Sequence, residues 1–195
     1  MAAIALAIWY VFGRPRPIKN AGTPVSVIVA FGDSLTAGEG AGHDPSNTYP
    51  GVLAQLTGKT VINEGYSGET ALNAPKHLRK VLSHKPQMVL IEFGGNDFLQ
   101  RLNVEDSVKS IAQIVDEVQA AGAIAVIVDT GGRGMGVYSK EYKKLARKKQ
   151  AVFVPGILNE IFNKREYMSD MVHPNFRGYK IVAEQVRLGI EPYLR

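Results

Sequence analysis

Five short apolar runs, separated by stretches long enough for helices, constrain the fold of this sequence more than any other feature. They are rich in Val and Ile and occupy residues 25–31, 60–63, 87–93, 123–129 and 151–154. A strand that is apolar at successive positions is covered on both faces, which is typical of a parallel sheet. Strands that alternate with helices form right-handed βαβ units, which allow few topologies. We therefore predict a three-layer α/β/α domain, flavodoxin-like, with a five-stranded parallel sheet of order 2-1-3-4-5.

The clearest helix is predicted between Asn103 and Ala121. Apolar residues recur there at spacings of three and four and form one stripe: Val104, Val108, Ile111, Val115 and Val118. Asn103, with Asp106 three positions later, is suited to cap its start, and Gly122 is suited to end it. A last helix is predicted after Pro174.

Composition is that of an ordinary globular protein of one domain. The chain has 195 residues, of which 45% are hydrophobic and 21% charged, and it contains no cysteine. The absence of cysteine excludes thiol catalysis, disulfides and thiolate metal sites.

The first 23 residues differ from the rest. "MAAIALAIWYVF" is apolar throughout, and the basic linker "GRPRPIKNAG" follows it. Twelve apolar residues are fewer than the ~20 that span a bilayer. We expect either a membrane anchor or signal remnant, or an extra element packed on the domain at 24–195. The first alternative predicts a bacterial periplasmic protein, or one anchored facing the envelope, while a cytoplasmic location stays open.

A second basic segment lies at 140–149, where "KEYKKLARKK" has six cationic residues and one acidic one. The pattern favours a solvated helix face, and contact with an anionic membrane surface is the alternative. We expect no nucleic-acid partner, because neither a recognisable binding motif nor an interleaving of aromatic and basic residues accompanies the charge. We expect the protein to be a monomer.

Polar and glycine-rich segments follow the predicted strands, at 32–35, 64–70, 94–97 and 169–175. Ligands of such sheets bind beyond the carboxyl ends of the strands, so these segments should meet at one rim. Ser34 is the candidate nucleophile, His173 its base and Asp170 the group that orients the base. The spacing of three would place Asp170 and His173 on one side of a helical turn.

The candidate oxyanion donors are the backbone N–H groups of Ser34 and Gly68 and the side-chain amide of Asn96. Gly32 and Asp33 are predicted to support the site, Gly32 by adopting angles forbidden to other residues and Asp33 by binding loop backbone. We expect His43 near the groove.

The other histidines, His77 and His84, follow the second predicted strand beside several basic residues. We expect both on the solvent-exposed face of a helix.

Four motifs resemble the SGNH hydrolases, also called the GDSL esterase/lipase family. They are "FGDSLTAGEG" with Ser34, "NEGYSGET" with Gly68, "GGND" with Asn96, and "DMVHPNFRGY" with Asp170 and His173. Within the family, the chain is most similar to the bacterial thioesterase I/lysophospholipase/arylesterase group. The resemblance implies a flavodoxin-like sheet and a serine hydrolase that cleaves esters or thioesters without a metal or other cofactor.

Two alternatives to a lipid or small-acyl esterase remain at this point. One is an O-deacetylase of cell-envelope polysaccharide, and the other is a non-catalytic binding module on the same scaffold. The loop after the fourth strand, residues 129–140, is rich in Gly and has no obvious wall for an acyl chain. We also consider it as a mobile lid.

Overall fold

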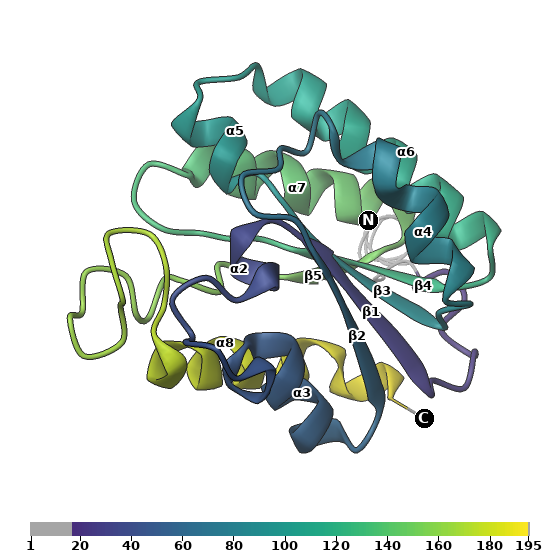
Figure 1. Ribbon diagram of the computed structural model, residues 1–195. Coiled ribbons are helices and arrows are strands. Elements are labelled where there is room, and N and C mark those ends of the chain that lie inside the picture. Colours follow the sequence, from purple (N-terminus) through teal and green to yellow (C-terminus); the bar gives the residue numbers. More distant parts are fainter. Residues whose placement is uncertain (1–16, 195) are drawn as a thin grey trace, which may run out of the picture.

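A five-stranded parallel sheet forms the middle layer of the protein, whose computed structural model describes residues 17–194 (Figure 1). Its strands are β1 (Val27–Gly32), β2 (Thr60–Gly65), β3 (Met88–Glu92), β4 (Ile124–Val128) and β5 (Val152–Val154). All neighbours pair in parallel, in the order β2-β1-β3-β4-β5. The predicted fold class and strand order are therefore confirmed, and the predicted strand ends differ by a few residues at most.

Helices cover both faces of the sheet (Figure 1). One layer contains α3 (Tyr49–Thr57) and α8 (Phe176–Ile190), and the other contains α4 (Leu78–Ser83), α6 (Val104–Ala120) and α7 (Gly136–Lys149). Two short helices, α2 (Ser34–Ala37) and α5 (Gly95–Leu99), begin just after strands β1 and β3. Single 3₁₀ turns lie at η1 (Pro45–Asn47), η2 (Ala74–His77) and η3 (Glu191–Tyr193).

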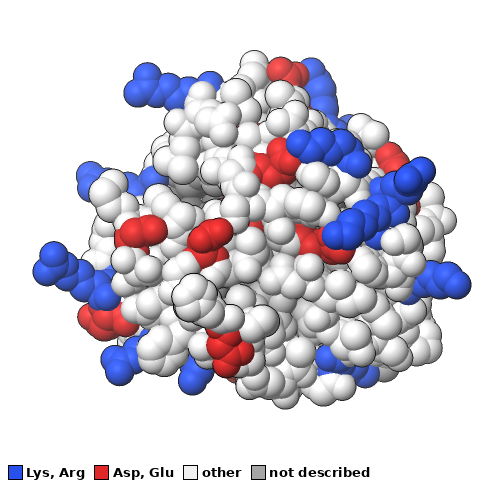
Figure 2. Space-filling view, in the orientation of Figure 1, with Lys and Arg blue, Asp and Glu red and all other residues white. Residues whose placement is uncertain are grey.

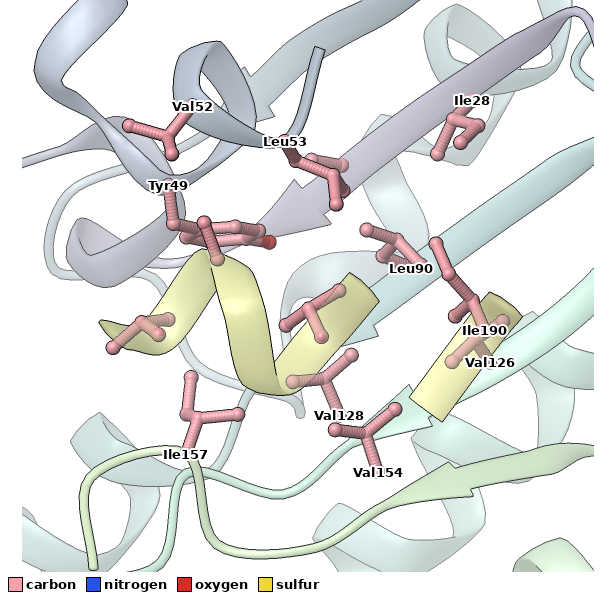
Figure 3. Packing of buried hydrophobic residues seen from close by; sticks show 14 of the residues in the cluster. Ile28, Tyr49, Val52, Leu53, Leu90, Val126, Val128, Val154, Ile157 and Ile190 are labelled. Atoms are coloured by element: carbon pink, nitrogen blue, oxygen red, sulfur yellow. The ribbon is translucent and has the colours of Figure 1, made fainter. Parts of the chain in front are cut away.

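The core lies on both faces of the sheet because successive strand side chains point to opposite sides. In β1, Ile28 and Ala30 pack toward α3 and α8, whereas Val29 and Phe31 pack toward α4 and α6. Figure 3 shows the first of these layers, where α8 lies over side chains of the central strands. Burying one Val, Ile or Phe side chain contributes about 1.5–3 kcal/mol to the free energy of folding. The sheet is thus a rigid support for the loops at its rim.

The predicted α6, its cap at Asn103 and its end at Gly122 are confirmed. The Asn103 side chain accepts a hydrogen bond from the Glu105 N–H at 2.7 Å, and Gly122 follows the helix with a left-handed φ of 85°. In α7 the basic residues are mostly exposed, and Lys149 pairs with Asp116 of α6 at 2.6 Å. Figure 2 shows one face of the molecule, where most basic side chains stand at the outline and most acidic side chains lie inside it.

The described part of the N-terminal linker lies at the amino end of the sheet, opposite the rim that carries α2 and α5. Lys19 N–H donates to the Gln150 carbonyl at 2.9 Å, and the Asn20 amide donates to the Ala123 carbonyl at 2.9 Å. The predicted apolar anchor at 1–12 lies outside the described residues. Within residues 17–194, every helix is too short or too polar to cross a bilayer.

Candidate active site

Ser34 lies at a sharp junction between a strand and a helix. Strand β1 ends at Gly32 and α2 begins at Ser34, so a single residue, Asp33, makes the turn. The Asp33 carboxylate caps the helix by accepting a hydrogen bond from the Leu35 N–H at 3.0 Å. This confirms the predicted role of Asp33 in binding loop backbone, and it leaves the Ser34 hydroxyl half-buried at the rim.

Gly32 supports this junction for a different reason from the one predicted. Its φ is not in the left-handed region, so a special backbone conformation does not explain it. A Cβ at this position would instead collide with the side chain of Thr36 and would lie 2.6 Å from the Glu92 carbonyl oxygen. Gly32 is needed because α2 folds back closely on the end of β1.

His173 and Asp170 meet Ser34 from the far end of the chain. The His173 Nε2 lies 3.0 Å from the Ser34 Oγ, and its Nδ1 lies 2.8 Å from an Asp170 carboxylate oxygen. Because a carboxylate only accepts, Nδ1 carries the proton in the neutral ring and Nε2 is free to accept from the serine hydroxyl. The three predicted catalytic residues are therefore side by side, in the order that a nucleophile, base and orienting group require.

The segment that holds His173 is a tight loop turn, and the predicted helical turn was wrong. The Ser169 N–H donates to the His173 carbonyl at 2.8 Å, and α8 begins only at Phe176. The second Asp170 oxygen accepts from the backbone N–H groups of Val172 and His173, each at 2.8 Å. These bonds close the turn, so the carboxylate is fixed by its own loop.

The same contacts keep Asp170 ionised. Partial burial raises the pKa of this carboxyl, but hydrogen bonds from the His173 ring and from two backbone N–H groups outweigh it and lower the pKa below its usual value. Asp170 is thus a carboxylate at neutral pH, although its side chain is 54% exposed. It can stabilise a positive charge on the His173 ring.

Asn96 and Gly68, the predicted oxyanion donors, occupy neighbouring loops. Asn96 lies in the first turn of α5, and its amide donates to the Glu69 carbonyl at 2.8 Å. Gly68 has a left-handed φ of 79°, and a Cβ there would point into open space. Asn96 lines the same pocket as Ser34, whereas Gly68 lies beside it, joined through the bond from Asn96 to the next residue. The oxyanion roles of Ser34, Gly68 and Asn96 stay predictions.

A polar network behind Gly68 was missed by the sequence interpretation. Glu69 pairs with Lys76 at 2.7 Å and with His77 at 2.8 Å, and the His77 ring stacks on Tyr66 at 3.7 Å between centroids. His77 is only 21% exposed, so the predicted wet position was wrong. No pattern in the sequence predicts these contacts. Glu69 lies in the loop after β2 and Lys76 and His77 lie in the 3₁₀ turn η2, so no regular helix or strand spacing relates them.

His84, also expected on a wet face, is paired in the same way. Its Nε2 lies 2.7 Å from a carboxylate oxygen of Glu64, which is almost fully buried at the end of β2, and the ring is 28% exposed. The other Glu64 oxygen accepts from the Tyr66 hydroxyl at 2.6 Å. The prediction for His84 was therefore wrong, because strand β2 places a buried carboxylate within its reach.

An apolar pocket of about 170 Å³ opens beside Ser34 and His173. Its largest apolar side chains come from α5 and from the loops after β4 and β5: Phe98, Leu99, Met135, Leu158 and Phe162. Residues 130–133 of the Gly-rich loop form part of the wall, so the expectation that this loop offers none was wrong. His43 is exposed and does not line the pocket, contrary to expectation.

Among residues 17–194, no three His, Asp or Glu side chains are grouped so that they could hold a metal ion. The expectation of a reaction without metal or cofactor stays a prediction.

Comparison with known proteins identifies the family of this chain. The model of the GDSL-like lipase/acylhydrolase family matches residues 30–181. The chain is 30% identical over 175 residues to thioesterase 1/protease 1/lysophospholipase L1 of Escherichia coli K12, covering 85% of this chain and 83% of that protein. It is 29% identical over 170 residues to an arylesterase of Vibrio mimicus, covering 82% and 85%.

Solved structures show the same fold. The crystal structure of TesA aligns with a TM-score of 0.79 at 24% identity, over 86% of this chain and 99% of that one. The family model spans the segments that carry Ser34, Gly68, Asn96, Asp170 and His173. The chain therefore belongs to the GDSL-like lipase/acylhydrolase family and is a serine ester hydrolase.

Proposed function

We propose that the protein hydrolyses carboxylic esters or thioesters of lipid-derived or small acyl groups through an acyl-enzyme on Ser34. The observation that carries this proposal is the continuous contact from the Ser34 Oγ through the His173 ring to Asp170, at 3.0 and 2.8 Å. The relatives named thioesterase, lysophospholipase and arylesterase support the same substrate class.

The reaction follows from the contacts. The Ser34 Oγ attacks the acyl carbonyl carbon while its proton passes to the His173 Nε2, and Asp170 stabilises the cationic ring. The Ser34 N–H, the Gly68 N–H and the Asn96 amide donate to the oxyanion, each worth roughly 100- to 1,000-fold in turnover. The C–O or C–S bond then breaks, and the leaving alcohol or thiol takes the proton from His173.

A water molecule completes the cycle. It attacks the acyl carbon of the Ser34 ester while His173 takes one of its protons, and collapse of the second oxyanion returns that proton to the Ser34 Oγ and releases the acid. Both halves use the same donors, so no further group of the protein is required.

The pocket favours an acyl chain over a bare acetyl group. Its wall next to Ser34 is built from aromatic and aliphatic side chains, which gain free energy by covering methylene groups. We therefore expect kcat/KM to rise from p-nitrophenyl acetate to esters of several more carbons. A profile that peaks at acetyl and falls at octanoyl would favour the O-deacetylase instead.

Ser34→Ala tests the proposal. We expect it to lower turnover of p-nitrophenyl esters on the order of a millionfold, as loss of the nucleophile does in comparable triads. A fluorophosphonate should add to Ser34 of the folded wild-type protein, with the modified peptide identified by mass spectrometry. Full activity in the purified Ser34→Ala variant, or an adduct only at another residue, would overturn the proposal.

A further inference from the structure

Two carboxyl groups are buried together directly under the nucleophile. Asp33 is 2% exposed and Glu92 is fully buried. Asp33 follows the end of β1 directly and lies beside the end of β3, because Gly32 pairs with Glu92 in the sheet and the Asp33 N–H donates to the Glu92 carbonyl at 3.2 Å. The two carboxyl groups also interact, because the Glu92 charge raises the pKa of Asp33.

The surroundings of the pair contain no compensating cation among the described residues. Hydroxyl groups and a further acid face it: Thr36, Thr130, Tyr49, Tyr142, Tyr179 and Asp97. Two carboxylates have no donor between them, so a hydrogen bond from one to the other requires a proton. Two unpaired negative charges at this depth would also be very costly.

The hydrogen bonds indicate which group keeps the proton. Glu92 accepts from both sides, from the Thr130 hydroxyl at 2.9 Å and from the Thr36 hydroxyl at 3.1 Å. Thr36 in turn contacts the Tyr49 hydroxyl at 3.0 Å. Two donated bonds stabilise a carboxylate on Glu92, whereas Asp33 accepts only one well-formed bond, from the Leu35 N–H at 3.0 Å. Burial raises the pKa of both carboxyl groups, and the Glu92 charge raises the pKa of Asp33 further, well above its usual value.

The location of Asp33 gives this proton a function. The residue precedes Ser34 directly, and its second oxygen lies 3.5 Å from the Asn96 amide nitrogen. A charge on Asp33 would therefore lie among the groups assigned to the oxyanion and would oppose the negative charge that develops there.

We propose that Glu92 is a positioning residue that keeps Asp33 as a neutral carboxylic acid, and so keeps negative charge away from the oxyanion site. Only the expected effect on kcat rests on the proposed function. The shared proton itself is a property of the folded protein with or without substrate.

The proton is tested by infrared spectroscopy of the full chain at pH 7. Wild type should show the carbonyl stretch of an un-ionised carboxylic acid, and Asp33→Asn should lose it. Glu64→Gln is the matched control, since Glu64 is also buried but pairs with Lys80 and His84, so the band should stay. Absence of the band in wild type, or its survival in Asp33→Asn, would overturn the assignment.

The kinetic consequence is tested by a double-variant cycle. Glu92→Gln keeps the shape but frees Asp33 to ionise, so kcat for a p-nitrophenyl ester should fall about 10- to 100-fold on the alkaline side, with KM little changed. Adding Asp33→Asn removes the charge at position 33. The double variant Asp33→Asn/Glu92→Gln should therefore recover most of the lost kcat, and its kcat should no longer fall at alkaline pH.

A double variant as slow as Glu92→Gln, or slower, would show that Glu92 acts only through packing and would sink the proposal. Should wild type hydrolyse no ester, the proposed function fails while the infrared result still decides the location of the proton.

Discussion

Two histidine–carboxylate pairs of this molecule have the same nitrogen–oxygen distance but differ in what the second ring nitrogen can contact. His173 lies 2.8 Å from Asp170, and His77 lies 2.8 Å from Glu69. The His173 ring has its second nitrogen 3.0 Å from the Ser34 hydroxyl, beside the apolar pocket. The His77 ring uses its Nε2 for Glu69 and stacks flat on Tyr66. A carboxylate partner therefore does not make a histidine a base, and a hydroxyl at the other nitrogen is also required.

The two pairs also differ in how the fold builds them. Asp170 and His173 belong to one short turn, which the backbone N–H groups of Val172 and His173 close. Glu69 and His77 join the loop after β2 to the 3₁₀ turn η2, and Lys76 shares the carboxylate. In the proposed mechanism the first pair orients a reacting group, while the second links the loop that carries Gly68 to η2.

The largest expected effect separates the two histidines. His173→Ala should lower kcat for p-nitrophenyl esters by a factor on the order of a million, because no other group takes the Ser34 proton. His77→Ala should cost less than about tenfold, because it only loosens the loop that carries Gly68. Steady-state kinetics of both purified variants checks this, with circular dichroism to show that each is folded. Equal losses in the two variants would contradict the distinction.

The second prediction concerns the carboxylates. Asp170→Asn should lower kcat roughly 1,000- to 10,000-fold, because the amide favours the wrong ring tautomer and no longer stabilises the cationic ring. Glu69→Gln, the matched change in the other pair, should leave kcat within about tenfold. The measurement is kcat at saturating ester over a range of pH. A mild loss in Asp170→Asn would mean that the exposed position of this carboxylate, 54% accessible, makes it dispensable.

The comparison also explains how much could be predicted from the sequence. Strand order and the rim position of Ser34, Asn96 and His173 follow from apolar runs and from the topology of parallel sheets, which place loops rather than side chains. The Asp170–His173 pair could be predicted because its members are three residues apart. The turn that holds them could not, because its bonds run between Ser169 and His173 and depend on the chain returning at Pro174.

Residues brought together by tertiary packing were missed or misread. In the sequence His77 is one of several polar residues next to Lys76. Its contact with Glu69 forms only when the loop after β2 folds. Glu92 ends an apolar strand and gives no sign of burial, yet the pairing of β1 with β3 places it under Asp33. Gly32 suggested an unusual backbone conformation, whereas its neighbour Thr36 shows that space is the reason.

The smallest expected effect is on stability, and it depends on pH. Burial raises the pKa of Glu69, but hydrogen bonds from Lys76, His77 and the Thr70 N–H outweigh it and lower the pKa to about 2. An unfolded Glu titrates near about 4.3. Because the folded pKa is the lower one, the stabilisation from ionised Glu69 is complete above about pH 4.3 and is lost as pH falls toward about 2.

Glu69→Gln should therefore lower the thermal unfolding midpoint by a few degrees at pH 7. The gap from wild type should narrow steadily as pH falls from about 4 to about 2, where the wild-type carboxylate also takes a proton. Glu105→Gln, an exposed change in the first turn of α6, serves as the control for loss of one acidic charge. A gap that stays constant down to pH 2 would mean that Glu69 stabilises the loop by its shape alone. The Glu69–His77 pair would then differ from the Asp170–His173 pair in two ways: its ring contacts no serine hydroxyl, and the charge of its carboxylate adds no stability.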